Sequence, residues 1–339
     1  MSDPWIGKTV FVTGVCGTVG SEVLRQLLAT GVSRVVGVDN NESSVFSAEN
    51  TYAADSRVKI YLGDVRDADA LRQQSEGADV ILHCAAFKHV IVCEESPRQA
   101  VRTNIEGTQN IIDAAVANGV ERVIFTSSDK AVNPTNVMGT SKLMGERLMT
   151  AANATRREGG PIFSCTRFGN VLGSRGSVIP VFLDQISSGG PVTLTDPGMT
   201  RFVMSIEEAA RLVLDTVFLA RGGEVFVTKM PVMRIADLAE VLIEQLSGSG
   251  AIPVDVIGAK AGEKLYEELM SDEEVRRAVE LDRFFVIKPA FTSVYGDVEY
   301  DYGQDAAPAS RQYNSSIESP VSADELLGLL RSWQILEQG

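Results

Sequence analysis

The first half of the chain alternates short apolar runs with segments of helix length, and this alternation constrains the fold more than any other feature. Strand-like apolar runs lie at residues 9–13, 35–38, 58–62, 80–83, 122–126 and 162–168. Repeated strand and helix units of this kind predict parallel strands joined by right-handed crossovers. The sequence therefore predicts a doubly wound α/β fold of the Rossmann type, with ligands at the carboxyl ends of the strands.

A glycine-rich turn follows the first predicted strand and precedes a helix predicted at residues 21–30. Its glycines are Gly14, Gly17 and Gly20. Glycines let the backbone approach a pyrophosphate closely, and the helix N-terminus offers free N–H groups. Glycine-rich turns also occur for packing reasons alone, so this motif by itself is only moderately specific for a dinucleotide.

An acidic residue strengthens the cofactor interpretation. Asp39 ends the second strand, nineteen residues beyond Gly20, where a carboxylate can accept hydrogen bonds from ribose hydroxyls. A helix cap is the alternative role for this residue. Asn40 and Asn41 follow instead of an arginine, so NAD is favoured over NADP as the cofactor. Further cofactor contacts are predicted at Thr18, Val19, Asn40, Asp64, Val65, Ala85 and Ala86.

An acid stands beside an amine directly after the predicted strand at residues 122–126. These residues, Asp129 and Lys130, are the first candidates for proton transfer, and a surface ion pair is the alternative. Eight residues past Lys130 comes Met138, and Lys142 lies four residues further on the same predicted helix. A thioether has no proton to exchange, so Met138 taken alone is best explained as a core residue.

The length of the chain predicts a second lobe beside the Rossmann domain. A chain of 339 residues exceeds the usual size of one hydrophobic core, so we expect a second lobe. The predicted Rossmann domain covers residues 1–168, with 206–230 returning to it. Residues 169–205 and 231–339 are predicted to form mainly the lobe that binds substrate.

Charge and hydropathy exclude several functions. The formal net charge of -14 argues against nucleic-acid or anionic-membrane binding. No apolar run approaches the ~20 residues of a membrane span, and the N-terminus lacks the features of a signal peptide, which predicts a cytoplasmic protein. The four cysteines have no metal-ligand spacing, so no metal site and only free thiols are expected.

Six longer segments carry a resemblance to a known family. They lie at residues 83–90, 104–108, 127–139, 167–180, 195–202 and 262–268. With them the chain resembles an extended short-chain dehydrogenase/reductase, and more narrowly the bacterial nucleotide-sugar 4,6-dehydratases acting on UDP-N-acetylglucosamine. The resemblance covers residues 8 to at least 330. In the dehydrogenases a Tyr-x-x-x-Lys pair occupies the positions of Met138 and Lys142, and one branch of the dehydratases has methionine there.

The resemblance implies a reaction in three steps. The sugar is oxidised at C4 with NAD(P)+, water is eliminated across C5 and C6, and the hydride returns to C6. Lys130 would take the C5 proton, for which its pKa must be depressed, and Asp129 would protonate the departing C6 hydroxyl, for which it must hold a proton. The two groups would titrate as a coupled pair.

The missing tyrosine requires another base for the C4 hydroxyl. Our hypothesis from the sequence is that Asp129, through Ser128 or a water, takes this proton and delivers it to the C6 oxygen. The resemblance also implies that Lys142 binds the nicotinamide ribose, and that Asn104 and Thr126 contact the cofactor.

Substrate contacts are expected from cations and polar residues of the second lobe. Arg175 and Arg201 are candidates for the pyrophosphate, because arginine suits phosphate geometry. The other predicted substrate contacts are Lys88, His89, Asn170, Thr195, Lys260 and Glu263. Lys260 replaces an arginine that is usual in relatives, so UDP-N-acetylglucosamine and GDP-N-acetylglucosamine both remain possible substrates. Each of these residues could also be merely structural.

Two other functions remain open. A nucleotide-sugar C4 epimerase would share the fold, the cofactor and much of the sugar pocket. The Asp129-Lys130 pair disfavours it, although related epimerases keep a version of this motif, and the product mass separates the two reactions. An NAD-sensing or scaffold protein is the non-enzymatic alternative, and the missing tyrosine is its best support. Relatives commonly dimerise through segments corresponding to residues 96–118 and 138–155, so a homodimer or larger homo-oligomer is expected.

Overall fold

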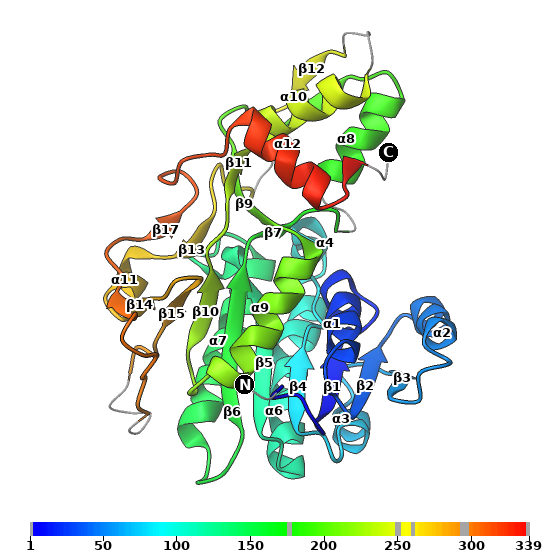
Figure 1. Ribbon diagram of the computed structural model, residues 1–339, viewed down its shortest axis with the longest axis vertical. Coiled ribbons are helices and arrows are strands. Elements are labelled where there is room, and N and C mark those ends of the chain that lie inside the picture. Colours follow the sequence, from blue (N-terminus) through cyan, green and yellow to red (C-terminus); the bar gives the residue numbers. More distant parts are fainter. Residues whose placement is uncertain (1–2, 175–177, 248–251, 259–261, 292–297, 337–339) are drawn as a thin grey trace.

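A ten-stranded sheet forms the body of the protein (Figure 1). The computed structural model describes residues 3–174, 178–247, 252–258, 262–291 and 298–336. The strand order is β16-β14-β15-β10-β6-β5-β4-β1-β2-β3. Its parallel strands are β1 (Thr9–Thr13), β2 (Arg34–Asp39), β3 (Val58–Leu62), β4 (Val80–His83), β5 (Arg122–Ser128), β6 (Ile162–Phe168) and β10 (Val225–Thr228). The predicted doubly wound fold is confirmed.

Apolar residues alternate between the two faces of the sheet. In β5, Val123 and Phe125 belong to the core on one face and Ile124 to the core on the other. A strand points successive side chains to opposite faces, so a continuous apolar run buries both. The helices that cover the first face are α3 (Ala68–Gln74), α6 (Gly107–Asn118) and α7 (Val137–Thr155), and those on the second are α1 (Thr18–Leu28) and α9 (Ile206–Leu219).

The strand order reverses at β1, which lies between β2 and β4. Crossovers leave this point in opposite directions, which opens a crevice at the carboxyl ends of the strands. Helix α2 (Glu42–Thr51) follows β2, and α4 (Val90–Glu95), α5 (Pro97–Ala100) and a π-helical turn (Val101–Glu106) follow β4. The fold thus places the glycine-rich turn and the loop after β4 on the same edge of the sheet.

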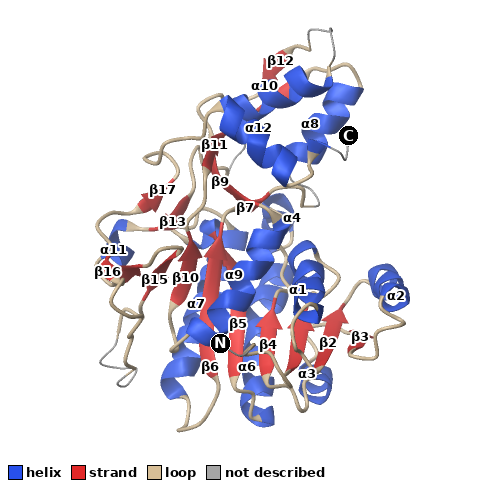
Figure 2. Cartoon of the chain, viewed as in Figure 1, coloured by secondary structure: helices blue, strands red, loops and turns tan. Residues whose placement is uncertain are grey.

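A separate lobe with its own apolar core sits above this edge (Figure 2). Its elements are β7 (Asn170–Val171), α8 (Val178–Ser187), β8 (Val192–Leu194), β9 (Thr200–Met204), β11 (Val232–Arg234), α10 (Ile235–Leu246), β12 (Val254–Val256) and α12 (Ala323–Ser332). None of the helices in the described ranges is both long and apolar enough to cross a bilayer.

The chain passes between body and lobe more than once. After the lobe come β13 (Glu268–Met270), α11 (Asp272–Val275), β14 (Ala278–Glu280), β15 (Phe284–Ile287), β16 (Ala307–Pro308) and β17 (Tyr313–Asn314). Although this region was predicted to belong mainly to the lobe, β14, β15 and β16 extend the large sheet, with β15 antiparallel to β10. Residues 262–268 connect the lobe to the body and contact the residues that follow β5, Lys130 and Val132.

Candidate active site

The glycine-rich turn after β1 brings backbone atoms unusually close together. Gly14 has φ +66°, and a Cβ at Gly20 would lie 2.1 Å from the Gly14 carbonyl oxygen. Helix α1 begins at Thr18, and its N-cap residue Gly17 makes no side-chain capping bond. The first-turn N–H groups, including those of Val19 and Gly20, are thus presented by a turn that admits no larger side chain. This cradle fits a pyrophosphate.

A cavity of ≈ 210 Å³, here called the dinucleotide cavity, opens beside this turn. Among the predicted cofactor residues its wall contains Gly14, Gly17, Asp39, Asn40, Asp64, Val65, Ala85 and Ala86. The Asp39 carboxylate accepts hydrogen bonds from the Cys16 and Asn41 N–H groups, at 3.1 and 3.0 Å. Asn41, rather than Asp39, caps α2. The residues present therefore fit the adenosine half of a dinucleotide.

Asn104 organises the loop after β4, in which Phe87 lines the dinucleotide cavity. It lies on the π-helical turn, a form that is frequent at functional sites. Its side chain accepts from the Phe87 N–H (2.8 Å) and donates to the Phe87 carbonyl (3.0 Å) and to Ser141 Oγ (2.8 Å). In this arrangement Asn104 ties the loop after β4 to α7.

The methionine and lysine of α7 lie deep in the protein. Met138 is 3% exposed and packs with Cys93 and Ala100. The Lys142 ammonium donates to the Thr126 carbonyl at 2.8 Å, and burial lowers the Lys142 pKa to about 8. Met138 thus supplies packing where a tyrosine would supply a hydroxyl.

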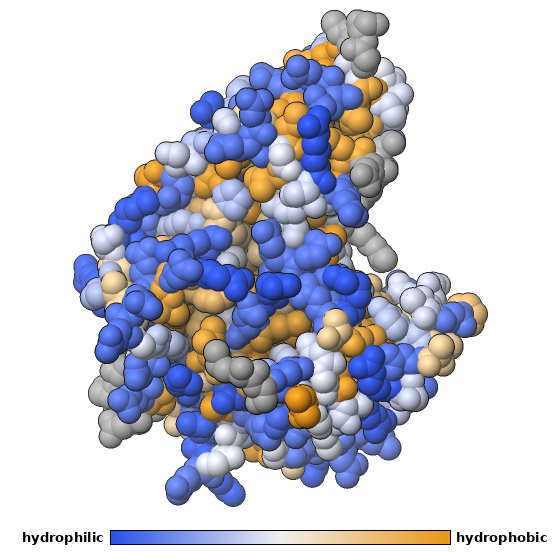
Figure 3. All heavy atoms as spheres, viewed as in Figure 1, coloured by the Kyte–Doolittle hydropathy of each residue, from blue (hydrophilic) through white to orange (hydrophobic). Residues whose placement is uncertain are grey.

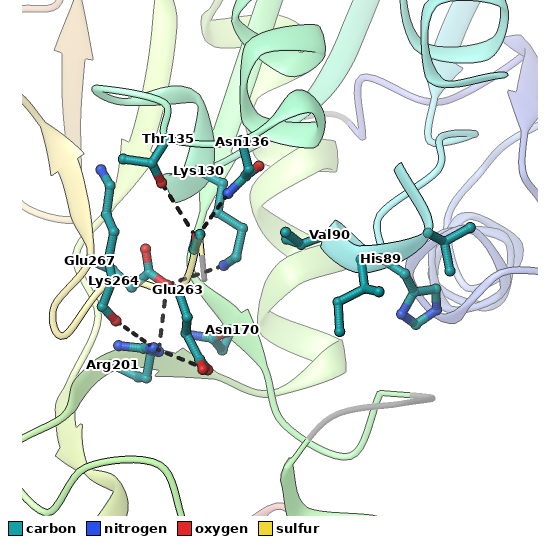
Figure 4. Close-up of a pocket in the computed structure, with 13 residues that line it drawn as sticks. His89, Val90, Lys130, Thr135, Asn136, Asn170, Arg201, Glu263, Lys264 and Glu267 are labelled. Atoms are coloured by element: carbon teal, nitrogen blue, oxygen red, sulfur yellow. Dashed lines mark hydrogen bonds and ion pairs between the residues drawn. The ribbon is translucent and has the colours of Figure 1, made fainter. Parts of the chain in front are cut away.

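A larger cavity of ≈ 590 Å³ lies between the body and the lobe. Figure 3 shows the molecule indented between these two parts. The wall is formed by His89, Val90, Ile91, Val92, Lys130, Thr135, Asn136, Asn170, Arg201, Gly262, Glu263, Lys264 and Glu267. In Figure 4 the charged residues gather on one side, with His89 and Val90 opposite them. An apolar helix end thus faces a cluster of ionisable groups.

Three ionisable residues form an acid–amine cluster at the end of β5: Asp129, Lys130 and Glu267. The Lys130 ammonium donates to Asp129 Oδ2 at 3.1 Å and to Glu267 Oε1 at 3.3 Å. Ser128 Oγ donates to Asp129. Lys130 and Glu267 line the larger cavity, whereas Asp129 is 1% exposed and lies behind them. The sequence predicted the first two members but missed Glu267, which it contained only as part of the segment 262–268.

The charges of this cluster differ from those expected from the sequence. Burial opposes the charged form of Lys130, but the charges of Asp129 and Glu267 outweigh it and raise the Lys130 pKa instead of depressing it. Burial likewise opposes ionisation of Asp129, yet Lys130 and Ser128 lower the Asp129 pKa, so this residue does not hold a proton. Burial, followed by the charge of Asp129, raises the Glu267 pKa to about 7. Glu267 is the carboxyl group that can hold a proton near neutral pH.

Arg201 meets the cluster from β9. Its Nε lies 3.5 Å from Glu267 Oε1, and its other nitrogens donate to the carbonyls of Thr200, Lys264 and Leu265. Asn170 donates to the Phe202 carbonyl at 3.3 Å. Both residues line the larger cavity together with Glu263, as Figure 4 shows.

The remaining predicted substrate residues are placed less centrally. Lys88 is exposed and directly precedes His89, which lines the larger cavity. Thr195 follows β8 in the lobe, outside that wall. Arg175 and Lys260 lie outside the described residues. Within the described ranges, no three histidine, cysteine or acidic side chains are grouped so that they could hold a metal ion.

A buried arginine fixes the strand that follows Glu267. Arg167, 1% exposed, pairs with Glu146 of α7 at 2.7 Å and with Glu274 of α11 at 3.1 Å. Its Nη1 also donates to the Leu269 carbonyl at 2.8 Å. Burial opposes ionisation of Glu274, but Arg167 lowers the Glu274 pKa to about 2. This clamp joins α7 to β13, the strand that directly follows Glu267.

Helix α7 packs its first turn directly on the cluster, which leads to a testable prediction. A Cβ at Gly139 would lie 2.1 Å from the Lys130 carbonyl oxygen. Gly139→Ala should therefore displace Lys130 and lower the free energy of unfolding by about 1–3 kcal/mol, as overpacking does. Denaturant unfolding and turnover measure both effects. Gly328→Ala is the control, since a Cβ there meets no atom within 4 Å.

The glycine cradle, the two cavities and the acid–amine cluster define an extended short-chain dehydrogenase/reductase that acts on nucleotide sugars. Residues 10–289 match the family described as "Polysaccharide biosynthesis protein", and the chain belongs to this family. The resemblance drawn from the sequence is thereby confirmed at the level of the nucleotide-sugar dehydratases and epimerases.

Relatives carry the names of two reactions. The UDP-N-acetylglucosamine 4,6-dehydratase (inverting) of Campylobacter jejuni is 36% identical over 302 residues, which cover 88% of each chain. The UDP-glucose 4-epimerase of Rickettsia felis is 34% identical over 341 residues, covering 98% of each chain. The chain is therefore an enzyme of the nucleotide-sugar dehydratase and epimerase family.

Solved structures support the same assignment. Pen from Bacillus thuringiensis superposes with a TM-score of 0.89 at 37% identity, covering 97% of this chain and 98% of that one. DesIV, the dTDP-glucose 4,6-dehydratase of Streptomyces venezuelae, was solved with NAD and TYD bound. It gives a TM-score of 0.68 at 25% identity, covering 76% of this chain and 86% of that one. The NAD bound in DesIV supports a nicotinamide cofactor for this chain.

Proposed function

We propose that the protein is an NAD-dependent 4,6-dehydratase that converts UDP-N-acetylglucosamine to a UDP-4-keto-6-deoxy-N-acetylhexosamine. The acid–amine cluster is the observation that carries this proposal. It places a half-buried amine and two buried carboxyl groups in or behind the wall of the larger cavity, next to the loop that borders the dinucleotide cavity. Proton-transfer groups beside a hydride carrier are what oxidation followed by elimination requires.

Each group of the cluster has a role in this proposal. A nicotinamide dinucleotide with its adenosine half in the dinucleotide cavity would supply reversible hydride transfer. Lys130 would pass its proton to Glu267, 3.3 Å away, which is the carboxyl group of the cluster that can hold a proton near neutral pH, and the neutral amine would then take the C5 proton. The C5 proton becomes acidic once C4 is a carbonyl. A carboxyl group of the cluster moves the C4 hydroxyl proton to the C6 oxygen, which leaves as water.

The substrate would lie along the wall of the larger cavity. Arg201 and Asn170 would face its diphosphate and sugar, and Glu263 its nucleotide ribose. His89 and Val90 would contact the sugar from the opposite side. Lys142 would bind the nicotinamide ribose. Assembly into a homodimer or larger homo-oligomer through residues 96–118 and 138–155 stays a prediction.

Mass spectrometry of the nucleotide sugars tests the reaction. The purified protein is incubated in parallel with UDP- and GDP-N-acetylglucosamine. We expect loss of ~18 mass units from the UDP sugar, the mass of one water in the C5–C6 elimination. The same loss from the GDP sugar alone would support dehydration but identify GDP-N-acetylglucosamine as the substrate. An unchanged mass in both cases contradicts dehydration.

C4 epimerisation is the second candidate, favoured by the relatives named UDP-glucose 4-epimerase. An epimerase returns the hydride to C4 and needs no proton transfer at C5. Incubation in deuterium oxide separates the two reactions, because only the dehydratase exchanges the C5 hydrogen. A C4 stereoisomer of unchanged mass, without deuterium at C5, would establish the epimerase.

Asp39 should determine the choice of cofactor. We expect Asp39→Ala to weaken NAD binding about 10- to 100-fold, because hydrogen bonds to a charged group are each worth about 1.5–3 kcal/mol. NADP binding should weaken less or improve, since the carboxylate that repels a 2′-phosphate is gone. Titration calorimetry with both dinucleotides measures the ratio. Equal losses for the two would show that Asp39 does not discriminate between them.

A further inference from the structure

We propose that Lys264 is a positioning residue, which holds the turn that carries Lys130 in place beside the larger cavity. This inference rests on the proposed dehydratase function, because Lys130 is the group that would take the C5 proton. Lys264 belongs to residues 262–268, here called the return segment, which connect the lobe to the body.

The turn that carries Lys130 is a weak element by itself. It is a single short 3₁₀ helix, Asp129–Ala131, which the Val132 N–H closes by donating to the Asp129 carbonyl at 3.0 Å. Hydrogen bonds of this helix type are poorly aligned. The next residue, Asn133, has φ +44°, in the left-handed region, and such a conformation persists only where the surrounding structure holds it. Contacts from elsewhere must therefore keep the turn in this form.

The return segment supplies these contacts. The Lys264 ammonium donates to the Val132 carbonyl at 2.9 Å and to Glu268 Oε2 at 3.4 Å. Glu268 in turn accepts from the Asn133 side-chain amide, whose nitrogen lies 3.2 Å from each carboxylate oxygen. Lys264, Glu268 and Asn133, here called the tether, thus bind both residues that follow the 3₁₀ helix.

The surroundings of the tether strengthen its bonds. The Lys264 side chain is 18% exposed and the Glu268 side chain 12%, so solvent and salt screen this pair less than a surface pair. Val132 is 3% exposed. A buried carbonyl that loses its donor costs about 1–3 kcal/mol, so the Val132 carbonyl favours the conformation in which Lys264 reaches it.

Two further hydrogen bonds join the return segment to the same loop. Thr135 Oγ1 and Asn136 Nδ2 donate to the Gly262 carbonyl at 3.4 and 3.3 Å (Figure 4). The Lys264 bond falls at Val132, only two residues after Lys130. It therefore acts on the backbone that directs the Lys130 side chain.

Direct contact with the substrate is the alternative role for Lys264, because this residue lines the larger cavity. An ammonium has three N–H groups, and Val132 and Glu268 accept from two of them. The two roles predict different losses. A residue that only binds substrate changes affinity, whereas a positioning residue changes turnover, since a displacement of a catalytic group by about 1 Å can cost about 100-fold.

Lys264→Met tests the inference in the purified protein. We expect turnover to fall about 10- to 100-fold, with UDP and NAD dissociation constants within about twofold of the wild type. Lys264→Arg, which keeps both donors, should restore most of the rate. Lys59→Met, which removes an ammonium paired with Glu49 in the body, is the control and should behave as the wild type. Normal turnover with weakened UDP binding would overturn the inference and make Lys264 a substrate contact.

A double-mutant cycle tests whether the tether acts as a unit. Glu268→Gln should lower turnover about 3- to 10-fold, and it should add little to Lys264→Met, because residues of one network are not additive. Asn133→Gly removes the amide and keeps a backbone that adopts positive φ freely, so it should resemble Glu268→Gln. Losses that multiply independently would contradict the tether.

Hydrogen–deuterium exchange gives a readout that needs no substrate. In Lys264→Met, the peptide that contains residues 129–136 should exchange about 10-fold faster than in the wild type, while the turn after β1 exchanges unchanged. Unchanged exchange at residues 129–136 would overturn the inference even if turnover falls. A wild type that never releases water would overturn the proposed function, while the exchange comparison still decides whether Lys264 holds this turn.

Discussion

Lys130→Met is expected to lower the rate of dehydration by about 10³-fold or more while NAD binding is retained. Methionine has nearly the length of lysine but can neither hold nor release a proton, and general-base catalysis is worth about 10²–10⁴ in rate. The change also removes the cation that Asp129 and Glu267 share, so their mutual repulsion adds to the loss. Mass spectrometry of the product and titration with NAD measure the two properties.

Exchange at C5 identifies which step fails in this variant. In deuterium oxide, the wild type should incorporate deuterium at C5 of the product, and Lys130→Met should not. Lys229→Met, which removes an ammonium paired with Glu280 in the body, serves as the control. Near-normal turnover of Lys130→Met would show that another group takes the C5 proton.

Arg167→Met is expected to lower the free energy of unfolding by about 3–5 kcal/mol, the largest stability effect that we predict for the chain. Removing one partner of a buried ion pair leaves the other charge without compensation. Here two carboxylates, Glu146 and Glu274, lose their cation together, and the Leu269 carbonyl loses a donor. Denaturant unfolding measures the loss. Arg167→Lys should recover only part of it, because an ammonium cannot make paired contacts with both carboxylates.

The same clamp gives stability a defined pH dependence. Glu274 has a pKa of about 2 in the folded protein, below its ordinary 4.5. Its ion pair therefore stabilises the fold fully above pH 4.5, and this contribution of ~3 kcal/mol is lost as the pH falls toward 2. Arg167→Met should flatten this part of the acid unfolding profile. An unchanged profile would assign acid sensitivity to other carboxylates.

Local patterns predicted the fold well. The parallel strands β1 to β6 fall on the predicted apolar runs, and α1 (Thr18–Leu28) overlaps the helix predicted at residues 21–30. Each of these features depends on periodicity within one short segment. The turn at Gly14 and the carboxylate of Asp39 also share one cavity, because consecutive strand ends meet at one edge of the sheet.

Long-range contacts were not predictable in the same way. Glu267 and Lys130 meet because the chain leaves the body, forms the lobe and returns, and no local spacing records that path. The predicted direction of the Lys130 pKa shift was wrong for the same reason. The sequence did not show that a second carboxylate, Glu267, stabilises the charged form of Lys130. In the sequence, the one signal for Glu267 was its place in a pair of adjacent glutamates after Lys264. The structure separates the two, because Glu267 is buried and Glu268 is half-buried.

The return of the chain across the site also fixes the order in which the parts of the active site are synthesised. All residues of the dinucleotide cavity lie at or before Thr103, whereas the acid–amine cluster is complete only when Glu267 has emerged. At usual rates of translation this interval is roughly ten seconds or more. A nascent chain thus presents its nucleotide cradle first and its proton-transfer groups last, so that chemistry begins only after the ribosome has made most of the protein.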